Sequence, residues 1–171
     1  MSLRARVAAA DDAAAIAAIY NEGIADRIAT FETEPRLPAQ IGAWFDGRHP
    51  IVVVEDAQRR IVAFASTSTY RGRTCYDGIA EYSVYVARDW RGRGAGRVAM
   101  TALIDAATKA GLWKLVSRIF PENVASRALM AHMGFREVGI YQRHGKLDGE
   151  WRDCVIVERL LGTAADADVP T

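Results

Sequence analysis

The loop at residues 91–97 carries the most specific chemical signal in this sequence of 171 residues, and it reads Arg91-Gly92-Arg93-Gly94-Ala95-Gly96-Arg97. An apolar, strand-like segment (79–86) precedes the loop, and an apolar, helix-like segment (98–110) follows it. Glycine has no Cβ, so a glycine-rich backbone can approach a ligand closely. The first N–H groups of a helix, together with its dipole, favour an anion at its start. With its three arginines, the loop predicts binding of a phosphorylated ligand such as a pyrophosphate.

The loop has two other possible interpretations. It overlaps the fingerprint G-x-G-x-x-G of dinucleotide-binding proteins, but a single match to that pattern is weak. A dinucleotide site also needs an acidic residue about 20 residues further on, at a strand end. Here the next strand-like segment (115–120) ends at Pro121, and the first carboxylate after it is Glu122. The second alternative is a solvated turn that merely needs glycines. The arginines and the flanking elements favour a ligand with more phosphate charge than NAD.

Composition narrows the class of protein. A net charge of +1 argues against a nucleic-acid-binding surface as the main theme. No apolar run is long enough to span a bilayer, and the first residues lack the apolar segment of a signal peptide. Cys75 and Cys154 lie far apart without metal-like spacing, so neither a metal site nor a disulfide framework is predicted. We expect a cytoplasmic protein with no metal, no nucleic-acid partner and no membrane partner.

The elements that position the loop follow from apolar periodicity. Three consecutive strands, then strands alternating with helices, predict an α/β fold with a central mixed sheet and helices on both faces. We expect one domain (1–162) and a small, acidic, disordered tail (163–171). The ligand crevice should lie where the strand that leads into the loop ends. The expected strands are 3–8, 51–55, 61–70, 79–86, 115–120, 135–141 and 154–160, and the expected helices run from Asp11 or Asp12 to Gly23 and over 37–45, 96–110 and 124–133.

The sequence resembles the GCN5-related N-acetyltransferase (GNAT) superfamily. The loop at 91–96 is similar to the superfamily's acetyl-CoA loop, Q/R-x-x-G-x-G/A. Asn123-x-Ala125-Ser126 and Met133-Gly134-Phe135 resemble a later segment, in which Asn-x-x-Ser precedes a helix that ends in Gly-Phe. The resemblance covers nearly the whole chain. It implies the GNAT fold and acetyl-CoA as co-substrate.

A narrower resemblance is to the phosphinothricin N-acetyltransferases. It rests on Ile19-Tyr20-Asn21, on residues 30–35 (Thr-Phe-Glu-Thr-Glu-Pro), on residues 80–86 (Ala-Glu-Tyr-Ser-Val-Tyr-Val) and on Trp151-x-Asp153. That family includes enzymes for methionine sulfoximine, methionine sulfone and arsinothricin. The resemblance implies acetylation of the α-amino group of a small, glutamate-like amino acid, an association with antibiotic or herbicide resistance, and a homodimer.

Carried over by position, the resemblance assigns two groups of site residues. The expected substrate site consists of Arg71, Gly72, Arg73, Glu81, Tyr82 and Ser83. The expected acetyl-CoA contacts are Val84, Tyr85, Val86, Arg91, Gly92, Arg93, Gly94, Ala95, Gly96, Arg97 and Asn123. Arginine pairs suit carboxylates and phosphinates, although two solvated loop charges would read the same way. Asn123 could equally cap the following helix.

Glu81 is the expected catalytic residue, as a base or as a group that holds the substrate ammonium. A carboxylate on an apolar strand is costly unless it is paired or used, and a salt bridge to Arg71 or Arg73 is the alternative. Tyr85 could protonate the leaving thiolate or simply pack in the core. One departure from the family stands out: its histidine before Gly-Phe corresponds to Met130 here, and His132 lies about 200° further around the helix.

Alternative functions remain open from the residues alone. The chain could acetylate another small amine, such as a polyamine, or a protein N-terminus. It could also be a non-catalytic acyl-CoA-binding module, because the family histidine is missing. Arg71 and Arg73 argue against a polyamine, and Glu81 with the complete glycine loop argues against a non-catalytic module.

Overall fold

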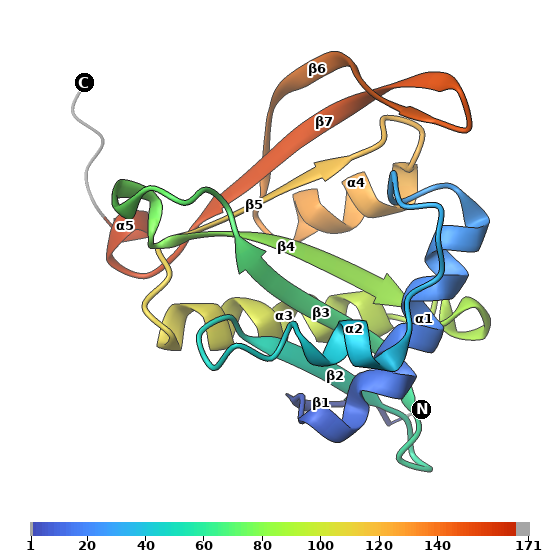
Figure 1. Cartoon of the computed structure of the whole chain (residues 1–171). Helices are drawn as coiled ribbons and strands as arrows, with labels where there is room; N and C mark the ends of the chain where they lie inside the picture. The colour runs from blue at the N-terminus through green and yellow to red at the C-terminus, as the bar shows by residue number, and fades with distance from the viewer. Residues whose placement is uncertain (1, 167–171) are drawn as a thin grey trace.

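The protein is a single seven-stranded sheet with helices packed on both faces (Figure 1), seen here in a computed structural model that describes residues 2–166. The strands are β1 (Arg4–Val7), β2 (Ile51–Glu55), β3 (Ile61–Thr69), β4 (Ile79–Val86), β5 (Lys114–Ile119), β6 (Arg136–Leu147) and β7 (Glu150–Leu160). The helices are α1 (Ala13–Asp26), α2 (Pro38–Gly42), α3 (Ala95–Lys109), α4 (Val124–His132) and α5 (Thr163–Asp166), with single 3-10 turns at Ala10–Asp12, Thr74–Tyr76 and Arg88–Trp90.

The sheet is mixed, as the sequence predicted, with the strand order β1-β2-β3-β4-β5-β7-β6. All neighbours are antiparallel except β4 and β5, which run parallel. The parallel pairing is short: it joins Ile79 to Lys114, Ala80 to Leu115 and Glu81 to Val116, and there it stops. β4 and β5 both continue beyond this point, so the sheet opens between them, as their diverging arrows in Figure 1 show.

Alternation along β4 divides its side chains between the two helical layers. Ala80 and Tyr82 point into the core cluster formed with α3 and α4, which includes Met100 and Leu103. Tyr85 points the opposite way, into the core under α1 and α2 around Phe64. Since successive side chains of a strand alternate, Glu81 and Ser83 share the α1/α2 face with Tyr85. The candidate side chains of Glu81, Ser83 and Tyr85 therefore all face the α1/α2 side of the sheet.

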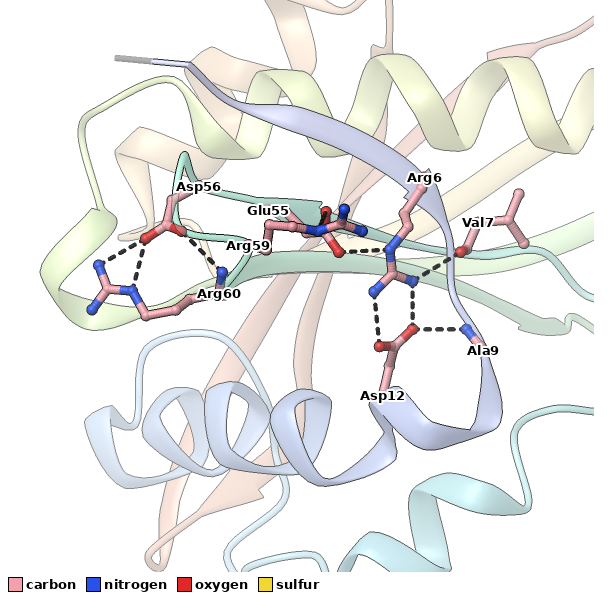
Figure 2. Close-up of polar contacts among 8 residues, drawn as sticks. All are labelled: Arg6, Val7, Ala9, Asp12, Glu55, Asp56, Arg59 and Arg60. Atoms are coloured by element: carbon pink, nitrogen blue, oxygen red, sulfur yellow. Dashed lines mark hydrogen bonds and ion pairs between the residues drawn. The ribbon is translucent and has the colours of Figure 1, made fainter.

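A buried ion cluster joins β1, β2 and the start of α1 (Figure 2). Arg6 donates from Nη1 to Asp12 at 2.7 Å and from Nε to Glu55 at 2.7 Å. The two carboxylate side chains are only 11% and 6% exposed. The hydrogen bond from Arg6, rather than the opposing effect of burial, governs Asp12 and lowers the pKa of its carboxyl group. The cluster ties the first strand and first helix to the sheet, and it lines neither of the cavities described below.

The structure differs from the sequence-based prediction mainly at the end of the chain. The strands expected at 135–141 and 154–160 are longer and form one hairpin, β6–β7. Its turn is Asp148-Gly149, and both residues have positive φ (50° and 81°), the conformation that makes Asp-Gly a hairpin signal. Residues 163–166, assigned to a disordered tail, form α5; residues 167–171 lie outside the described part of the chain. Within residues 2–166, no helix is long and apolar enough to cross a membrane.

Candidate active site

A cavity of about 390 Å³, cavity 1, fills the opening between β4 and β5. The ends of both strands, the glycine loop and the starts of α3 and α4 surround it. Of the expected acetyl-CoA contacts, Arg93 alone does not line it. The expected lining residues are Val84, Tyr85, Val86, Arg91, Gly92, Gly94, Ala95, Gly96, Arg97 and Asn123, and they are joined by Gly23, Ile28, Ala29, Tyr82, Ser83, Trp90, Ser117, Arg118, Ile119, Phe120, Ala125, Ser126 and Leu129.

The glycine loop has the geometry that phosphate binding requires. Gly92 and Gly94 have φ of 74° and 86°, and a Cβ on either would meet no protein atom within 4 Å. The backbone therefore borders open space, in a conformation that other residues adopt only with strain. Gly94 is the N-cap of the 15-residue helix α3, so the free N–H groups of that helix start at the loop. These residues fit the pyrophosphate of acetyl-CoA.

The arginines of the loop have different partners. Arg91 donates to Asp26 at the end of α1 (Nη1–Oδ2 2.6 Å) and to the carbonyl of Val86, so its guanidinium is held at the cavity wall. Arg88 shares the same carboxylate, and hydrogen bonds from Arg88 and Arg91 lower the pKa of Asp26. Arg93 lies over the Trp90 ring, 5.3 Å from its centroid. Arg97 lines the cavity from the first turn of α3.

Beyond Glu81 the side of β4 that faces β5 has no strand partner. On its other side, Val84, Tyr85 and Val86 pair with Ala65, Phe64 and Ala63 of β3. Successive residues of a strand direct their N–H and C=O groups to alternate sides. Part of this backbone therefore faces cavity 1 with free hydrogen-bonding groups, which can pair with an amide-bearing ligand or hold a developing oxyanion.

Glu81 stands at the base of the opening and pairs with Arg118 of β5. Arg118 Nη2 lies 3.2 Å and 3.4 Å from the two carboxylate oxygens. The sequence suggested Arg71 or Arg73 as the structural partner of Glu81, and neither is its partner here. Arg118 was missed because only the pairing of β4 with β5, in which Glu81 lies opposite Val116, brings it beside Glu81. In the sequence, Arg118 shares one face of a short strand with another cation, Lys114, and nothing in that pattern marks it as a site residue.

Arg71, Gly72 and Arg73 lie in the connection between β3 and β4 and are exposed. The Arg71 guanidinium lies over the Tyr70 ring, 5.2 Å from its centroid. None of the three lines either cavity, but the connection begins just after Thr69, which lines cavity 2. The structure therefore places these arginines at the rim of the α1/α2 face rather than at the opening between β4 and β5.

A second cavity, cavity 2, of about 660 Å³, lies on the α1/α2 face beside cavity 1. Ser83 and Tyr85 line both cavities. The two spaces therefore meet at β4, next to the backbone that can bind a thioester arm. The other residues that line cavity 2 are Tyr20, Arg36, Gln40, Ala43, Trp44, Asp46, His49, Ser66, Thr67, Ser68 and Thr69.

The aromatic candidates are mostly packed. Tyr85 stacks on Phe64 (5.5 Å between centroids) and meets Tyr20 edge-on at 5.0 Å, and burial raises its pKa. The phenol therefore keeps its proton, as a donor to a thiolate must. Phe31 packs against Phe120 rather than in either cavity. Trp44 lines cavity 2 and also packs on Tyr20.

Tyr82 and Met130 form a buried pair on the opposite face of the sheet. The Tyr82 hydroxyl donates to Met130 Sδ at 2.7 Å, and burial raises the pKa of Tyr82. Because the side chain of Tyr82 points into the α3/α4 core, its ring faces away from Glu81 and Ser83. Met130, at the position of the family histidine, is a core residue, and His132 is exposed at the end of α4.

Asn123 is the N-cap of α4: its Oδ1 accepts the Ser126 N–H at 3.2 Å. Its Nδ2 also donates to the Ile28 carbonyl at 3.3 Å, which links α4 to the segment after α1, and both residues line cavity 1. The capping role considered from the sequence is thus present, at a position that also lines the cavity. Within the described residues, no group of three His, Cys, Asp or Glu side chains could hold a metal ion.

Comparison with known proteins agrees with this geometry. A model described as "Acetyltransferase (GNAT) family" matches residues 16–135. The chain is 35% identical over 171 residues to an L-methionine sulfoximine/L-methionine sulfone acetyltransferase of Pseudomonas aeruginosa, covering 98% of this chain and 99% of that protein. It is 34% identical over 149 residues to a phosphinothricin N-acetyltransferase of Streptomyces coelicolor, covering 84% and 87% of the two chains.

A solved structure extends the comparison to three dimensions. It is a GNAT superfamily phosphinothricin acetyltransferase from Sinorhizobium meliloti in complex with acetyl-CoA. It matches this chain with a TM-score of 0.89 and 29% identity, over 100% of this chain and 94% of that one. The two chains therefore share the architecture of a mixed sheet flanked by helices.

Proposed function

The chain belongs to the GNAT acetyltransferase family and is an acetyl-CoA-dependent N-acetyltransferase, and on that premise we propose that it acetylates the α-amino group of a small, glutamate-like amino acid. The observation that carries the proposal is the meeting of cavities 1 and 2 at Ser83 and Tyr85. An amine that enters from cavity 2 reaches β4 where the thioester end of a ligand in cavity 1 would lie. Phosphinothricin and methionine sulfoximine are the acceptors named for its relatives.

The residues of cavity 1 bind and orient the acetyl donor. The N–H groups at the start of α3, with Arg91 and Arg97, hold the pyrophosphate, and the backbone groups of Val84 to Val86 that face cavity 1 pair with the pantetheine arm. Bound acetyl-CoA supplies the activated acetyl group as a thioester. A backbone N–H of the same segment of β4 stabilises the oxyanion that develops on the carbonyl. Tyr85, which keeps its proton, donates to the departing thiolate.

On the acceptor side, the carboxylate of Glu81 holds the substrate ammonium next to Ser83, which lies two residues further along the same face of β4. Arg71 and Arg73 bind the anionic groups of the acceptor from the rim of cavity 2, since guanidinium groups match carboxylates and phosphinates. Tyr82 contributes only its backbone, because its ring lies on the other face. An acceptor with both an ammonium and one or two anionic groups satisfies Glu81 and the arginines together.

Magnitudes favour alignment as the main contribution to the rate. An α-amino group with a pKa of about 8 is about one-tenth neutral at pH 7, so its deprotonation costs only about 1.4 kcal/mol. Correct alignment of two bound reactants can contribute about 7–11 kcal/mol. The groups that position the amine therefore matter more to turnover than the strength of any base.

The test is a thiol-release assay with acetyl-CoA against a panel of amines. The panel contains phosphinothricin, methionine sulfoximine, methionine sulfone, arsinothricin, glutamate, spermidine and a short peptide with a free N-terminus. We expect the glutamate-like compounds to be acetylated with the highest kcat/KM. Faster turnover of spermidine or of the peptide would replace this substrate class. Acetyl-CoA binding without turnover of any amine would indicate a non-catalytic module.

We also propose a homodimer that covers the edge strand β6. The side chains of Val138, Ile140 and Tyr141 on β6 and of Trp151 on β7 are each about half exposed. An exposed edge strand with apolar side chains is a favourable site for pairing with another chain. Light scattering on the purified protein should give twice the chain mass, and Ile140→Lys should reduce it to that of one chain. A monomeric wild-type protein would refute the proposal.

We also propose that the protein is cytoplasmic and has no nucleic-acid partner. A cytoplasmic location is supported by two free cysteines, the exposed Cys75 and the buried Cys154. A net charge of +1 supports the absence of a nucleic-acid partner. Cell fractionation, and retention on a nucleic-acid column at low salt, would test the two statements.

A further inference from the structure

Cavity 2 contains a histidine–aspartate pair that the sequence did not single out. The side chain of His49 is only 6% exposed, and its Nδ1 is hydrogen-bonded to Oδ2 of Asp46. Both residues line cavity 2. Among the residues that the structure describes, the other ring nitrogen, Nε2, has no hydrogen-bond partner. This is the arrangement in which a carboxylate fixes the tautomer of an imidazole and leaves Nε2 free to accept a proton.

The connection between α2 and β2 holds the pair in place. Oδ1 of Asp46 accepts the backbone N–H groups of Arg48 and His49, each at 2.8 Å. Desolvation would raise the pKa of Asp46, but the His49 ring and these N–H groups together lower it to about 2. Asp46 therefore stays ionised and holds the His49 ring in place through its Oδ2. Pro50, the next residue, is fixed to β3 because its carbonyl accepts both the N–H and the hydroxyl of Thr67.

Sheet register places His49 in line with the acceptor side of β4. Ile51 of β2 pairs with Ser66 of β3, and the next residue, Pro50, accepts a hydrogen bond from Thr67. Continuing this register by one more residue places His49 opposite Ser68. Ser68 pairs in turn with Glu81, and Ser66 pairs with Ser83. The two strand spacings between His49 and β4 amount to about 10 Å. Hydroxyl groups of Ser66, Ser68 and Ser83 line this stretch of cavity 2 and can hold the waters that bridge it.

We propose that His49, oriented by Asp46, accepts through waters in cavity 2 the proton that the acceptor ammonium loses before acetyl transfer. The inference rests on the proposed function, because it takes the amine to reach β4 from cavity 2. One proton of the ammonium passes to Nε2 of His49 and from there to solvent. The neutral nitrogen then forms a bond to the thioester carbon and the C–S bond breaks. The nitrogen gives up a second proton, and the departing thiolate takes one up, so the net products are the amide, the free thiol and one proton released to solvent.

The other charged and titratable groups around cavity 2 are poor proton acceptors at neutral pH. Arg36 is a cation paired with Glu32. Burial raises the pKa of both Tyr20 on α1 and Tyr85 on β4, so both phenols stay protonated. Asp46 already carries its charge. Glu81, beside the cavity, is engaged by Arg118 and by the ammonium that it holds. Imidazole is the side chain whose charge ordinarily changes between about pH 5 and 8.

The decisive variant is His49→Asn, whose amide can still donate to Asp46 but cannot take up a proton. His132→Asn is the matched control, because His132 is exposed on α4 and lines neither cavity. We expect His49→Asn to lower kcat at pH 7 about tenfold, because the amine must then reach its neutral form without an acceptor, at a cost of about 1.4 kcal/mol. The KM for acetyl-CoA and the thermal midpoint should stay at wild-type values. Asp46→Asn should give a smaller loss in the same direction, and His132→Asn none.

Two further readouts separate proton transfer from a structural role. The loss of kcat in His49→Asn should be largest near pH 6 and should become small above about pH 8, where most of the α-amine is already neutral without an acceptor. An α-aminooxy analogue of the acceptor, whose nitrogen is neutral throughout that range, should be acetylated by His49→Asn almost as fast as by the wild type. A variant that is equally slow with the analogue would show that His49 only shapes the cavity, and this would overturn the proposal.

The assay uses whichever amine of the panel the wild-type protein acetylates fastest. Failure of the wild type to acetylate any amino acid refutes the proposed substrate class and leaves the His49 comparison intact on another amine. Wild-type kcat and an unchanged pH profile in His49→Asn refute the proton acceptor and leave the substrate class intact.

Discussion

Glu81 of β4 and Val116 of β5 are the last residues that pair these two parallel strands. The pairing ends at Glu81, so this residue lies at the base of the opening that forms cavity 1. The residues after Glu81 are free of β5 and present backbone groups to cavity 1, while the side chain of Ser83 lines cavity 2. One interrupted strand pair thus opens cavity 1 next to cavity 2, and Ser83 and Tyr85 line both.

Gly94→Val should weaken acetyl-CoA binding about tenfold or more, because the added side chain would occupy the space beside the loop where the pyrophosphate lies. Calorimetric titration measures the affinity. Gly111→Val is the matched control, since Gly111 has nearly the same φ (84° against 86°) and lines neither cavity. Both variants should lose similar stability from backbone strain. Wild-type affinity in Gly94→Val would remove the loop from the cofactor site.

Glu81→Gln should lower turnover and leave the acetyl-CoA affinity unchanged, because the amide cannot balance the charge of the ammonium. A charge-assisted hydrogen bond contributes about 1.5–3 kcal/mol, which corresponds to a loss of about tenfold to a hundredfold. Arg118→Ala, which removes the ion pair but keeps the carboxylate, should retain more activity. Steady-state kinetics from about pH 6 to 9 make the comparison. If Glu81→Gln behaves as the wild type throughout, the carboxylate has only a structural role.

Arg71→Ala and Arg73→Ala should each raise the KM for the amino acid about tenfold to a hundredfold, since each change removes a charge-assisted pair worth about 1.5–3 kcal/mol. The KM for acetyl-CoA should barely change. Arg59→Ala, another exposed arginine in a loop remote from both cavities, should change neither constant. The opposite pattern, a raised KM for acetyl-CoA alone, would assign the two arginines to the cofactor phosphates.

Arg6→Met should destabilise the fold by about 3–5 kcal/mol, because it leaves the nearly buried carboxylates of Asp12 and Glu55 without their cation. Arg59→Met is its control: that side chain also reaches Glu55, at 3.7 Å, but is 75% exposed, so it should cost at most about 1 kcal/mol. Urea unfolding monitored by circular dichroism measures both. Equal effects of the two variants would show that burial does not decide the strength of this cluster.

The same cluster predicts a dependence of stability on pH. Arg6 lowers the pKa of Asp12 in the folded state. The contribution of the pair is therefore complete above the unfolded-state pKa of about 3.9 and is lost as the pH falls through the lower, folded-state pKa. The thermal midpoint of the wild type should fall below about pH 4 more steeply than that of Arg6→Met. Parallel curves for the two proteins would contradict this account.

The sequence alone determined the parts of the protein that depend on local chemistry. The glycines at 92 and 94 require positive φ, the arginines supply charge next to a helix start, and apolar periodicity fixes most strands and the mixed sheet. These signals lie within a few residues of one another, so the chain reveals them without its fold. The hairpin β6–β7 was underestimated because its middle lacks apolar alternation, although its Asp148-Gly149 turn was a readable signal.

Only the tertiary structure decided which distant residues meet. Arg118 became the partner of Glu81 because β4 and β5 pair at Glu81 and Val116, two residues before Arg118, and Tyr82 points towards Met130 because that face of β4 packs on α3 and α4. His49 acquired a place opposite Ser68 through the register of β2 and β3, in which Ile51 pairs with Ser66. Such contacts depend on strand order and on which face is buried. The residue types along the chain do not reveal strand order or the buried face at any single position.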